Sequence, residues 1–299
     1  MCIIGSKEVF LCLGKGMMWK NKNNSLSVTI SSMGAEITSV KKDEKELIWQ
    51  ADPAVWKGYA PLLFPICGGL KDNKFIYDRK AYIMPKHGFA RNSEFEIEAA
   101  LENSATFLLK SNDETKNCYP FDFELRVIYS LIENELTITY DIKNTTDGDM
   151  YFSIGSHEAY SCPNGISEWS VIFDKEEDLI ATPVDGPLLT YDKNILAKNT
   201  RILPLKDEYF EIDALVFLNL KSRKLTLKND ITGDEIKLDF DGFPYLLIWT
   251  KPNAKYICLE PWCGIPDFVD SDFDITKKKG IIHLGKGEDT VRTHKILFL

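Results

Sequence analysis

One carboxylate in this sequence stands where its neighbours give no structural reason for it. Residues 256–259 (Tyr-Ile-Cys-Leu) have the composition of a buried strand, and Glu260 follows them directly. An unpaired buried carboxylate is costly, so Glu260 must reach solvent, a partner or a ligand. A segment rich in Pro, Gly and Trp, residues 261–266, comes next, as at the mouth of a pocket. Glu260 is therefore the first candidate for acid–base chemistry.

Two of the four histidines lie in contexts that favour a site. His157 follows an alternating segment, residues 151–156 (Tyr-Phe-Ser-Ile-Gly-Ser), which predicts a titratable side chain at the end of a strand. His87 lies in residues 84–91 (Met-Pro-Lys-His-Gly-Phe-Ala-Arg), where a shaped loop could present an imidazole and the Arg91 guanidinium to one ligand. Read alone, each histidine is also compatible with an ordinary core or loop residue.

Other kinds of site are not indicated. The sequence contains no Walker loop, no GxGxxG after a predicted strand, no GxSxG elbow and no His/Asp cluster at metal-ligand spacing. Seven cysteines without a CxxC pair favour reduced thiols in a cytoplasmic protein over disulfides or a zinc site. We therefore expect no cofactor and no metal. His283 and His294, in late alternating segments, are expected on the surface.

The net charge of the chain limits the classes of partner that we expect. The 299 residues carry a formal net charge of -9, with 44% hydrophobic and 27% charged residues as in an ordinary globular protein. An acidic chain without a basic block argues against nucleic acid or an anionic membrane as a partner. The apolar residues 1–19 are too short and too charged to span a bilayer, so we expect a strand or an extension there.

The elements that must position these residues are predicted to be strands. The clearest segments with a period of two are residues 25–31, 36–40, 45–49, 105–110, 123–131, 135–142, 224–228 and 235–240. No stretch keeps a helical period for three turns, so the sequence predicts an all-β protein, a large antiparallel β-sandwich. Without a linker or a repeat, residues 1–299 are expected to form a single domain. Alternation also predicts that Tyr256, Cys258 and Glu260 share one strand face.

One carboxylate and two histidines fit proton transfer between oxygens without a cofactor. The chain is rich in aromatic residues, among them Phe64, Tyr160, Trp249 and Trp262. Aromatic faces with polar donors suit a pyranose, whose axial C–H faces are apolar and whose hydroxyls need hydrogen bonds. A glycosidase would need a pair of carboxylates, and no second carboxylate has the character of Glu260.

Several segments, in a fixed order, resemble the aldose 1-epimerase (galactose mutarotase-like) family, most closely its LacX-like branch. They are residues 34–40, 61–68, 85–91, 153–157, 213–217, 256–267 and 279–288, and they span roughly residues 25 to 299. The resemblance implies a galactose mutarotase-like supersandwich with the active site on the concave face of one sheet. It also implies a cofactor-free isomerase that interconverts the α and β anomers of a hexose by opening and reclosing the ring.

The same resemblance implies roles for single residues. His157 corresponds to the general acid of the family and Glu260 to its general base. His87 corresponds to the histidine that hydrogen-bonds the sugar near its ring oxygen, Asp213 to the carboxylate that holds sugar hydroxyls, and Trp262 is expected at the pocket rim. A histidine near its reference pKa of about 6.5 can donate and accept protons at neutral pH. Both a monomer and a homodimer are compatible with the sequence.

The sequence departs from the family pattern at one position, where a positively charged residue is replaced by glycine. An Arg commonly follows the position of Gly68, but residue 69 is Gly, and Arg91 is the candidate to replace it. The Phe-Ala-Arg that ends at Arg91 also resembles the hexose-6-phosphate 1-epimerases, in which arginines bind the phosphate, although a second, upstream Arg is absent. A phosphorylated hexose is therefore the alternative substrate, and a non-catalytic carbohydrate-binding protein is the alternative function.

Overall fold

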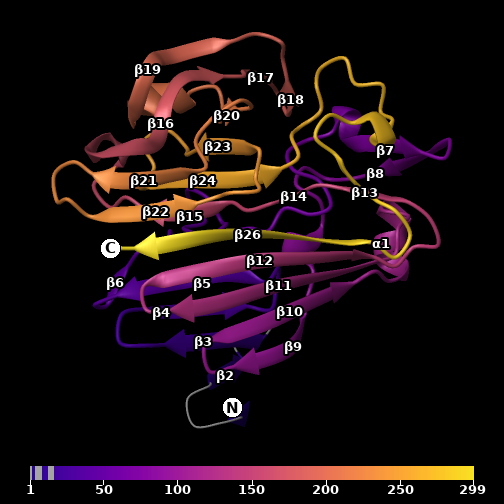
Figure 1. The fold of residues 1–299 in the computed structure, drawn as a ribbon, viewed down its shortest axis with the longest axis horizontal. Coiled ribbons are helices and arrows are strands. Elements are labelled where there is room, and N and C mark those ends of the chain that lie inside the picture. The colour runs from indigo at the N-terminus through magenta and orange to yellow at the C-terminus, as the bar shows by residue number, and fades with distance from the viewer. Residues whose placement is uncertain (1, 4–8, 13–16) are drawn as a thin grey trace.

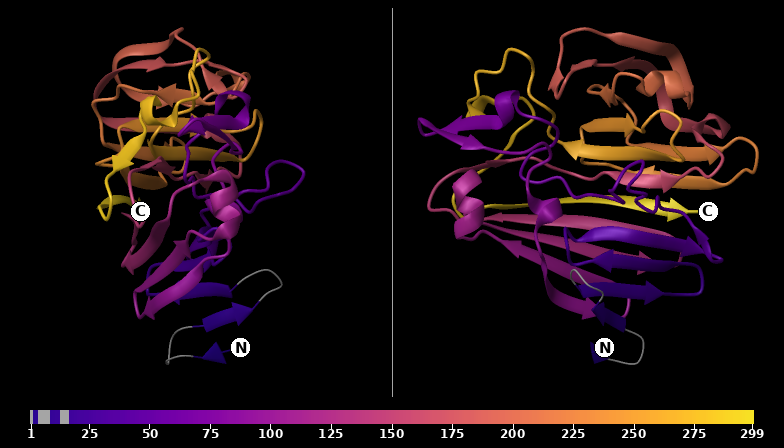
Figure 2. Two further views of the ribbon diagram at one scale, coloured as in Figure 1. Left: turned by 90° about the vertical axis from the view of Figure 1, so that its right-hand side faces the viewer. Right: turned by 180° about the vertical axis from the view of Figure 1, so that it is seen from behind.

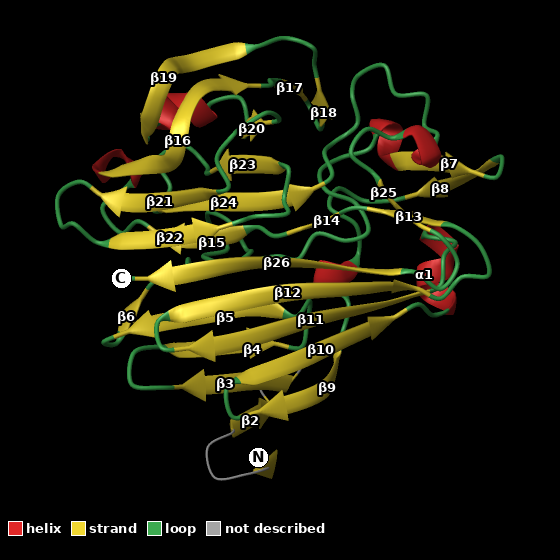
Figure 3. Cartoon of the chain, in the orientation of Figure 1, coloured by secondary structure: helices red, strands yellow, loops and turns green. Residues whose placement is uncertain are grey.

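The computed structural model describes residues 2–3, 9–12 and 17–299 (Figure 1). Antiparallel strands dominate this part of the chain, with one α-helix, α1 (Asp113–Cys118), and short 3₁₀ turns (Figure 3). The 3₁₀ turns are η1 (Lys71–Asn73), η2 (Ala90–Asn92), η3 (Ile166–Glu168), η4 (Asp207–Phe210) and η5 (Ile275–Lys277). The predicted all-β class is confirmed, and all eight predicted strand segments contain strands.

The first layer is a nine-stranded antiparallel sheet. Its order across the described chain is β19 (Asn194–Pro204), β16 (Trp169–Ala181), β21 (Lys224–Asn229), β22 (Glu235–Asp239), β26 (Asp289–Phe298), β12 (Glu135–Asn144), β11 (Phe123–Ile132), β10 (Ser104–Lys110) and β9 (Glu96–Leu101). β11 and β12 pair over their full lengths and bury every second residue. One face of this sheet therefore packs into the core, as the period of two requires.

The second layer contains two sheets that a bridge between Ile48 and Tyr160 connects. Among the described residues, a six-stranded sheet has the order β1 (Cys2–Ile3), β2 (Val9–Cys12), β3 (Met17–Lys22), β4 (Ser27–Ser31), β5 (Glu36–Lys42) and β6 (Lys45–Glu46). A five-stranded sheet, also counted over the described residues, has the order β14 (Ile154–Gly155), β24 (Tyr256–Cys263), β23 (Tyr245–Trp249) and β20 (Leu215–Phe217), with β15 (Glu158–Ser161) also paired to β24. The turned views in Figure 2 separate the two layers.

Short two-stranded pairs flank these sheets. They are β7 (Lys74–Tyr77) with β8 (Lys80–Ile83), β13 (Met150–Phe152) with β25 (Ile282–Leu284), and β17 (Val184–Asp185) with β18 (Leu188–Leu189). In residues 1–19, where the sequence predicts a strand or an extension, the described part lies in β1, β2 and the start of β3. No helix in the described chain combines the length and the apolar composition needed to cross a bilayer.

The main hydrophobic core lies between the layers, and β24 has one face in it. Ile257 and Leu259 belong to this core, whereas Tyr256 and Cys258 pack in a separate aromatic cluster on the other face. The predicted alternation is therefore present. The prediction that the strand ends at Glu260 is wrong, because β24 continues through Cys263 and Glu260 pairs with Leu247 of β23. Glu260 thus gains its position from the middle of a sheet.

Candidate active site

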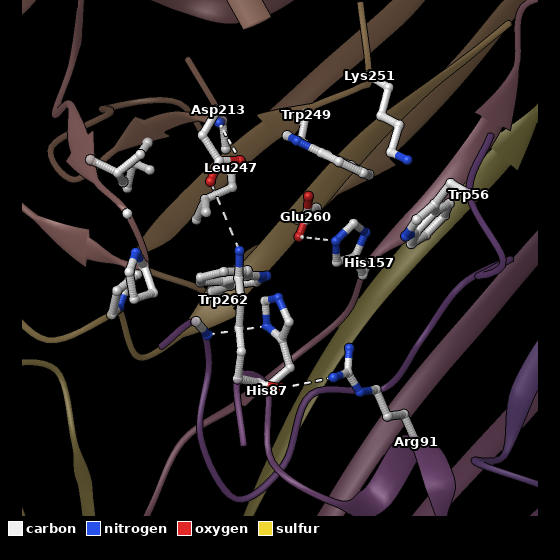
Figure 4. Close-up of a pocket in the computed structure, with 18 residues that line it drawn as sticks. Trp56, His87, Arg91, His157, Asp213, Leu247, Trp249, Lys251, Glu260 and Trp262 are labelled. Carbon is white, nitrogen blue, oxygen red and sulfur yellow. Dashed lines mark hydrogen bonds and ion pairs between the residues drawn. The ribbon is translucent and has the colours of Figure 1, made fainter. Parts of the chain in front are cut away.

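A cavity of about 280 Å³ opens on the face of the five-stranded sheet that is turned away from the main core. The structure brings all six sequence-predicted site residues to its lining (Figure 4). They are His87, Arg91, His157, Asp213, Glu260 and Trp262. The chain reaches this cavity from several distant segments, so the site exists only in the folded protein.

Glu260 projects from β24 into the cavity and is almost fully buried, with 2% of its side chain exposed. Burial raises the pKa of the Glu260 carboxyl well above its usual value. The Lys86 ammonium partly opposes this shift, and the negative charges of Glu158 and Asp213 add to it. Within the described chain, Glu260 Oε2 has no hydrogen-bond partner. A carboxyl group in this setting can hold a proton at a pH where an exposed glutamate cannot.

His157 occupies the two-residue break between β14 and β15, close to the strand end that the sequence predicts. Its Nε2 atom lies 3.4 Å from Glu260 Oε2. The imidazole stacks on Trp56 with 5.0 Å between ring centroids and meets Trp249 edge to face at 5.5 Å. Burial lowers the pKa of His157 to about 3, so the expectation of a value near 6.5 is wrong.

The two pKa shifts act in opposite directions on one pair. Burial raises the pKa of Glu260 and lowers that of His157, so it favours the carboxyl group over the imidazole as the site of a proton that the pair holds. Transfer of this proton to His157 would create an ion pair of the same net charge. The pair can therefore exchange a proton internally without changing the charge of the cavity.

Two hydrogen bonds join Gly68 to His87, and the bond to the ring fixes the tautomer of the imidazole. The backbone N–H of His87 donates to the Gly68 carbonyl at 2.8 Å, and the Gly68 N–H donates to the ring atom Nδ1 of His87 at 3.1 Å. Since Nδ1 accepts, the proton of the neutral imidazole lies on Nε2. Burial holds the pKa of His87 well below its usual value, so the ring is neutral. Its centroid lies 5.7 Å from that of His157, and it presents an N–H donor to the cavity.

Asp213 and Lys86 form the polar rim of the cavity. Asp213 Oδ1 accepts a hydrogen bond from the Ala214 N–H at 2.9 Å, and Asp213 Oδ2 lies 3.9 Å from Lys86 Nζ. Arg91 follows in the same loop as Lys86, and its Nη2 donates to the Lys86 carbonyl at 2.9 Å. The predicted carboxylate and cation are thus both at the cavity, and Lys86, which was not among the predicted site residues, joins them.

No side chain fits at residue 69. A Cβ on Gly69 would lie 2.6 Å from Pro187 Cβ and 2.9 Å from the Pro187 carbonyl oxygen. Pro187 lies in the turn between β17 and β18, which also lines the cavity. The space that an arginine at residue 69 would enter is therefore closed by a neighbouring hairpin.

A buried polar chain supports the pocket wall from the core side. Trp262 Nε1 donates to the Ser156 carbonyl at 3.1 Å, and Ser156 Oγ donates to Glu158 Oε2 at 2.7 Å. Glu158 Oε1 lies 3.0 Å from Nε2 of His294, which projects from β26 of the first layer. His294 is fully buried, so the prediction that it lies on the surface is wrong. An alternating strand next to two others has one face in the core, and His294 falls on that face.

Sequence reasoning missed part of the lining. Trp56 and Lys251 both line the cavity, and Trp56 lies in the loop between β6 and η1, outside every segment singled out in the sequence. Of the aromatic residues considered for a sugar site, Trp249 and Trp262 are at the cavity, whereas Phe64 and Tyr160 are buried in the main core. Alternation along β23 was the available signal for Trp249, because it places Leu247 and Trp249 on the face of Glu260.

The chain is similar to proteins of known sequence and structure. The family model described as aldose 1-epimerase matches residues 17–295. Protein LacX (chromosomal) of Lactococcus lactis subsp. lactis is 38% identical over 259 residues, which cover 82% of this chain and 87% of that protein. A galactose mutarotase related enzyme from Lactobacillus acidophilus has a TM-score of 0.89 and 34% identity, covering 95% of this chain and 97% of the other. A galactose mutarotase-like protein from Lactobacillus casei ATCC 334 has a TM-score of 0.90 and 27% identity, covering 94% and 100%.

Proposed function

This chain belongs to the aldose 1-epimerase family, and we propose that it interconverts the α and β anomers of a free hexose. One observation carries the proposal: a buried imidazole and a buried carboxyl group, His157 and Glu260, lie 3.4 Å apart in one cavity. Its volume of about 280 Å³ lies near the lower end for ligand pockets, which suits a monosaccharide.

In the proposed reaction Glu260 accepts the proton of the anomeric hydroxyl while His157 donates a proton to the ring oxygen. The C1–O5 bond breaks, and the open-chain aldehyde rotates about the C1–C2 bond. The hydroxyl then re-attacks from the other face as both proton transfers run in reverse. The pair therefore starts with its proton on His157 and holds it on Glu260 while the ring is open.

The pKa shifts of the pair bear directly on this cycle. Burial favours the proton on Glu260, which is the arrangement that the pair has when the ring is open. To begin a turnover, the proton must move over the short distance to His157. A sugar hydroxyl that donates to Glu260 favours this move, because a hydrogen bond to a carboxylate stabilises its charged form. The neutral His87, which donates from Nε2, and the indole rings of Trp249 and Trp262 are proposed to orient the ring.

The test is an anomer-exchange experiment on purified protein. Magnetisation transfer between the anomeric protons of D-glucose and D-galactose is measured for wild type, Glu260→Gln, His157→Asn and the control Glu208→Gln, which makes the same change on an exposed residue. We expect the two site variants to lose on the order of 10²–10⁴-fold in rate and the control to lose nothing. Equal rates in wild type and Glu260→Gln over several hexoses would refute the proposal. Binding of a sugar without any acceleration would favour the non-catalytic alternative.

A second cleft favours one further candidate, a phosphorylated hexose. This cleft shares Trp56, Arg91 and Lys251 with the first cavity. Its lining adds Lys57 and one carboxylate, Glu36, which accepts hydrogen bonds from two backbone N–H groups. An excess of cations beside the sugar site on an acidic protein suits an anionic substituent.

Acceleration of anomer exchange on glucose 6-phosphate would distinguish a phosphorylated hexose from a free hexose as the substrate. We expect Arg91→Ala to raise KM for the phosphorylated sugar with little effect on free glucose, whereas the exposed control Arg79→Ala changes neither. An Arg91→Ala variant with equal losses on both sugars would argue against a phosphate contact.

A further inference from the structure

A thiol lies beside the His157–Glu260 pair. One imidazole nitrogen of His157, Sγ of Cys258 and one carboxylate oxygen of Glu260 all lie within 4.8 Å of one another. Cys258 and Glu260 share the cavity-side face of β24, because they are two residues apart in one strand. Cys258 pairs with Ala159 of β15, and this small side chain leaves the thiol in reach of the pair.

Two polar atoms of this group are buried without a hydrogen bond among the described residues, although Glu260 Oε2 lies 3.4 Å from His157 Nε2. In the described chain, neither Glu260 Oε2 nor His157 Nδ1 has a hydrogen-bond partner, and both atoms are buried. Lys86, the ammonium that could neutralise Glu260, lies 3.9 Å from Asp213.

The donor set selects the kind of cation. A thiolate, an imidazole and a carboxylate are the three ligand types that Zn²⁺ accepts, and three protein ligands with one open position are typical of accessible zinc sites. Mg²⁺ and Ca²⁺ prefer oxygen ligands and would gain little from sulfur. One thiolate and one carboxylate also balance the two charges of the ion, so the occupied site would be neutral in its buried setting.

We propose that His157, Cys258 and Glu260 form a binding site for a thiophilic divalent cation of the Zn²⁺ class, with its open position toward the cavity. Binding releases the thiol proton of Cys258 and any proton that Glu260 carries. Because the ion takes the imidazole and the carboxylate, cation and sugar exclude each other. This exclusion rests on the proposed function, whereas the metal site itself does not.

Cobalt substitution tests the metal site without any sugar. Co²⁺ added to the wild-type protein is expected to give a thiolate-to-cobalt charge-transfer band that Zn²⁺ abolishes by displacement. The band is expected to vanish in Cys258→Ser and to remain in Cys263→Ser, which makes the same change in the same strand on the opposite face. Zn²⁺ affinity, measured by calorimetry, is expected to fall at least about 100-fold in Cys258→Ser, since even outer-shell partners cost 10–100-fold. Thermal unfolding of each variant checks that it is folded.

Two results would overturn the proposal. One is the absence of a charge-transfer band in wild type, and the other is a band that survives in Cys258→Ser or disappears in Cys263→Ser. Inhibition of anomer exchange gives a separate readout: Zn²⁺ should raise the apparent KM in wild type, EDTA should reverse this, and Cys258→Ser should resist it. If wild type shows no anomer exchange at all, the proposed function fails while the cobalt band still decides the metal site.

Discussion

Pro187 stands where any side chain at residue 69 would have to go, with its Cβ 2.6 Å from the Cβ that Gly69 lacks. The hairpin of β17 and β18 thereby forms one wall of the cavity and removes one position from which a cation could reach a sugar. The cations that remain at the cavity are Lys86, Arg91 and Lys251. The glycine at residue 69, which departs from the family pattern, is thus matched to the position of the hairpin of β17 and β18.

Gly69→Ala is expected to lower the free energy of unfolding by about 1–3 kcal/mol, the usual cost of overpacking. Urea unfolding of the variant measures this. Gly148→Ala serves as the control, because a Cβ there meets no atom within 4 Å, and it should change stability by less than about 0.5 kcal/mol. Pro187→Gly removes the nearest atom, so the double variant should lose less than the sum of the single changes. If Gly69→Ala and Gly148→Ala lower the free energy of unfolding equally, the hairpin of β17 and β18 moves to accept the added Cβ.

The pH profile of kcat/KM for anomer exchange should be broad and displaced from the usual titration of histidine. Activity requires a single proton on the pair, so the acid limb follows His157, whose pKa is lowered to about 3, and the alkaline limb follows the raised pKa of Glu260. We expect activity to persist at a pH of about 5, well below the reference histidine pKa of about 6.5. An acid limb near that reference value would contradict the burial of the pair.

Glu260→Gln is expected to stabilise the protein at neutral pH while it removes activity. A folded-state pKa raised above the usual 4.5 means that the folded state binds the proton more tightly. This contribution is fully present below the unfolded pKa and is lost as the pH rises through the folded value. Glutamine does not titrate, so the Glu260→Gln variant keeps this stability at every pH. Its free energy of unfolding should therefore exceed that of wild type by an amount that grows above pH 4.5 toward about 1–3 kcal/mol. Denaturant unfolding at several pH values measures the difference, and an advantage that is independent of pH would contradict this account.

Glu158→Ala should cost on the order of 1–3 kcal/mol or more, because it leaves His294 and Ser156 buried without their acceptor. Glu158→Gln keeps an acceptor oxygen and should cost less. Thermal unfolding compares both with Glu208→Ala at an exposed position, where no change is expected. Equal losses in the alanine and glutamine variants would mean that hydrogen bonding to Glu158 contributes nothing.

The strands and most of the proposed site were predictable because they depend on local pattern. Alternation alone is enough to place Glu260, Cys258 and Tyr256 on one face of β24. What was not predictable depends on neighbours distant in sequence. The pKa of His157 is set by general burial, to which Trp56 and Trp249 contribute, and no local pattern reports burial by distant loops. The pairing of Glu158 with His294 likewise requires knowledge of which sheets face each other.

The position of β26 bears on how the protein forms during synthesis. Residues 289–298 are the last strand of the described chain to leave the ribosome, yet β26 lies between β12 and β22. Until β26 emerges, the strands β9–β12 lack the element that joins them to β16, β19, β21 and β22 in the nine-stranded sheet, and Glu158 lacks His294. Nascent chains should therefore expose two unpaired strand edges until residues 289–298 have left the ribosome, and chaperones that bind unpaired strands should bind them during this period.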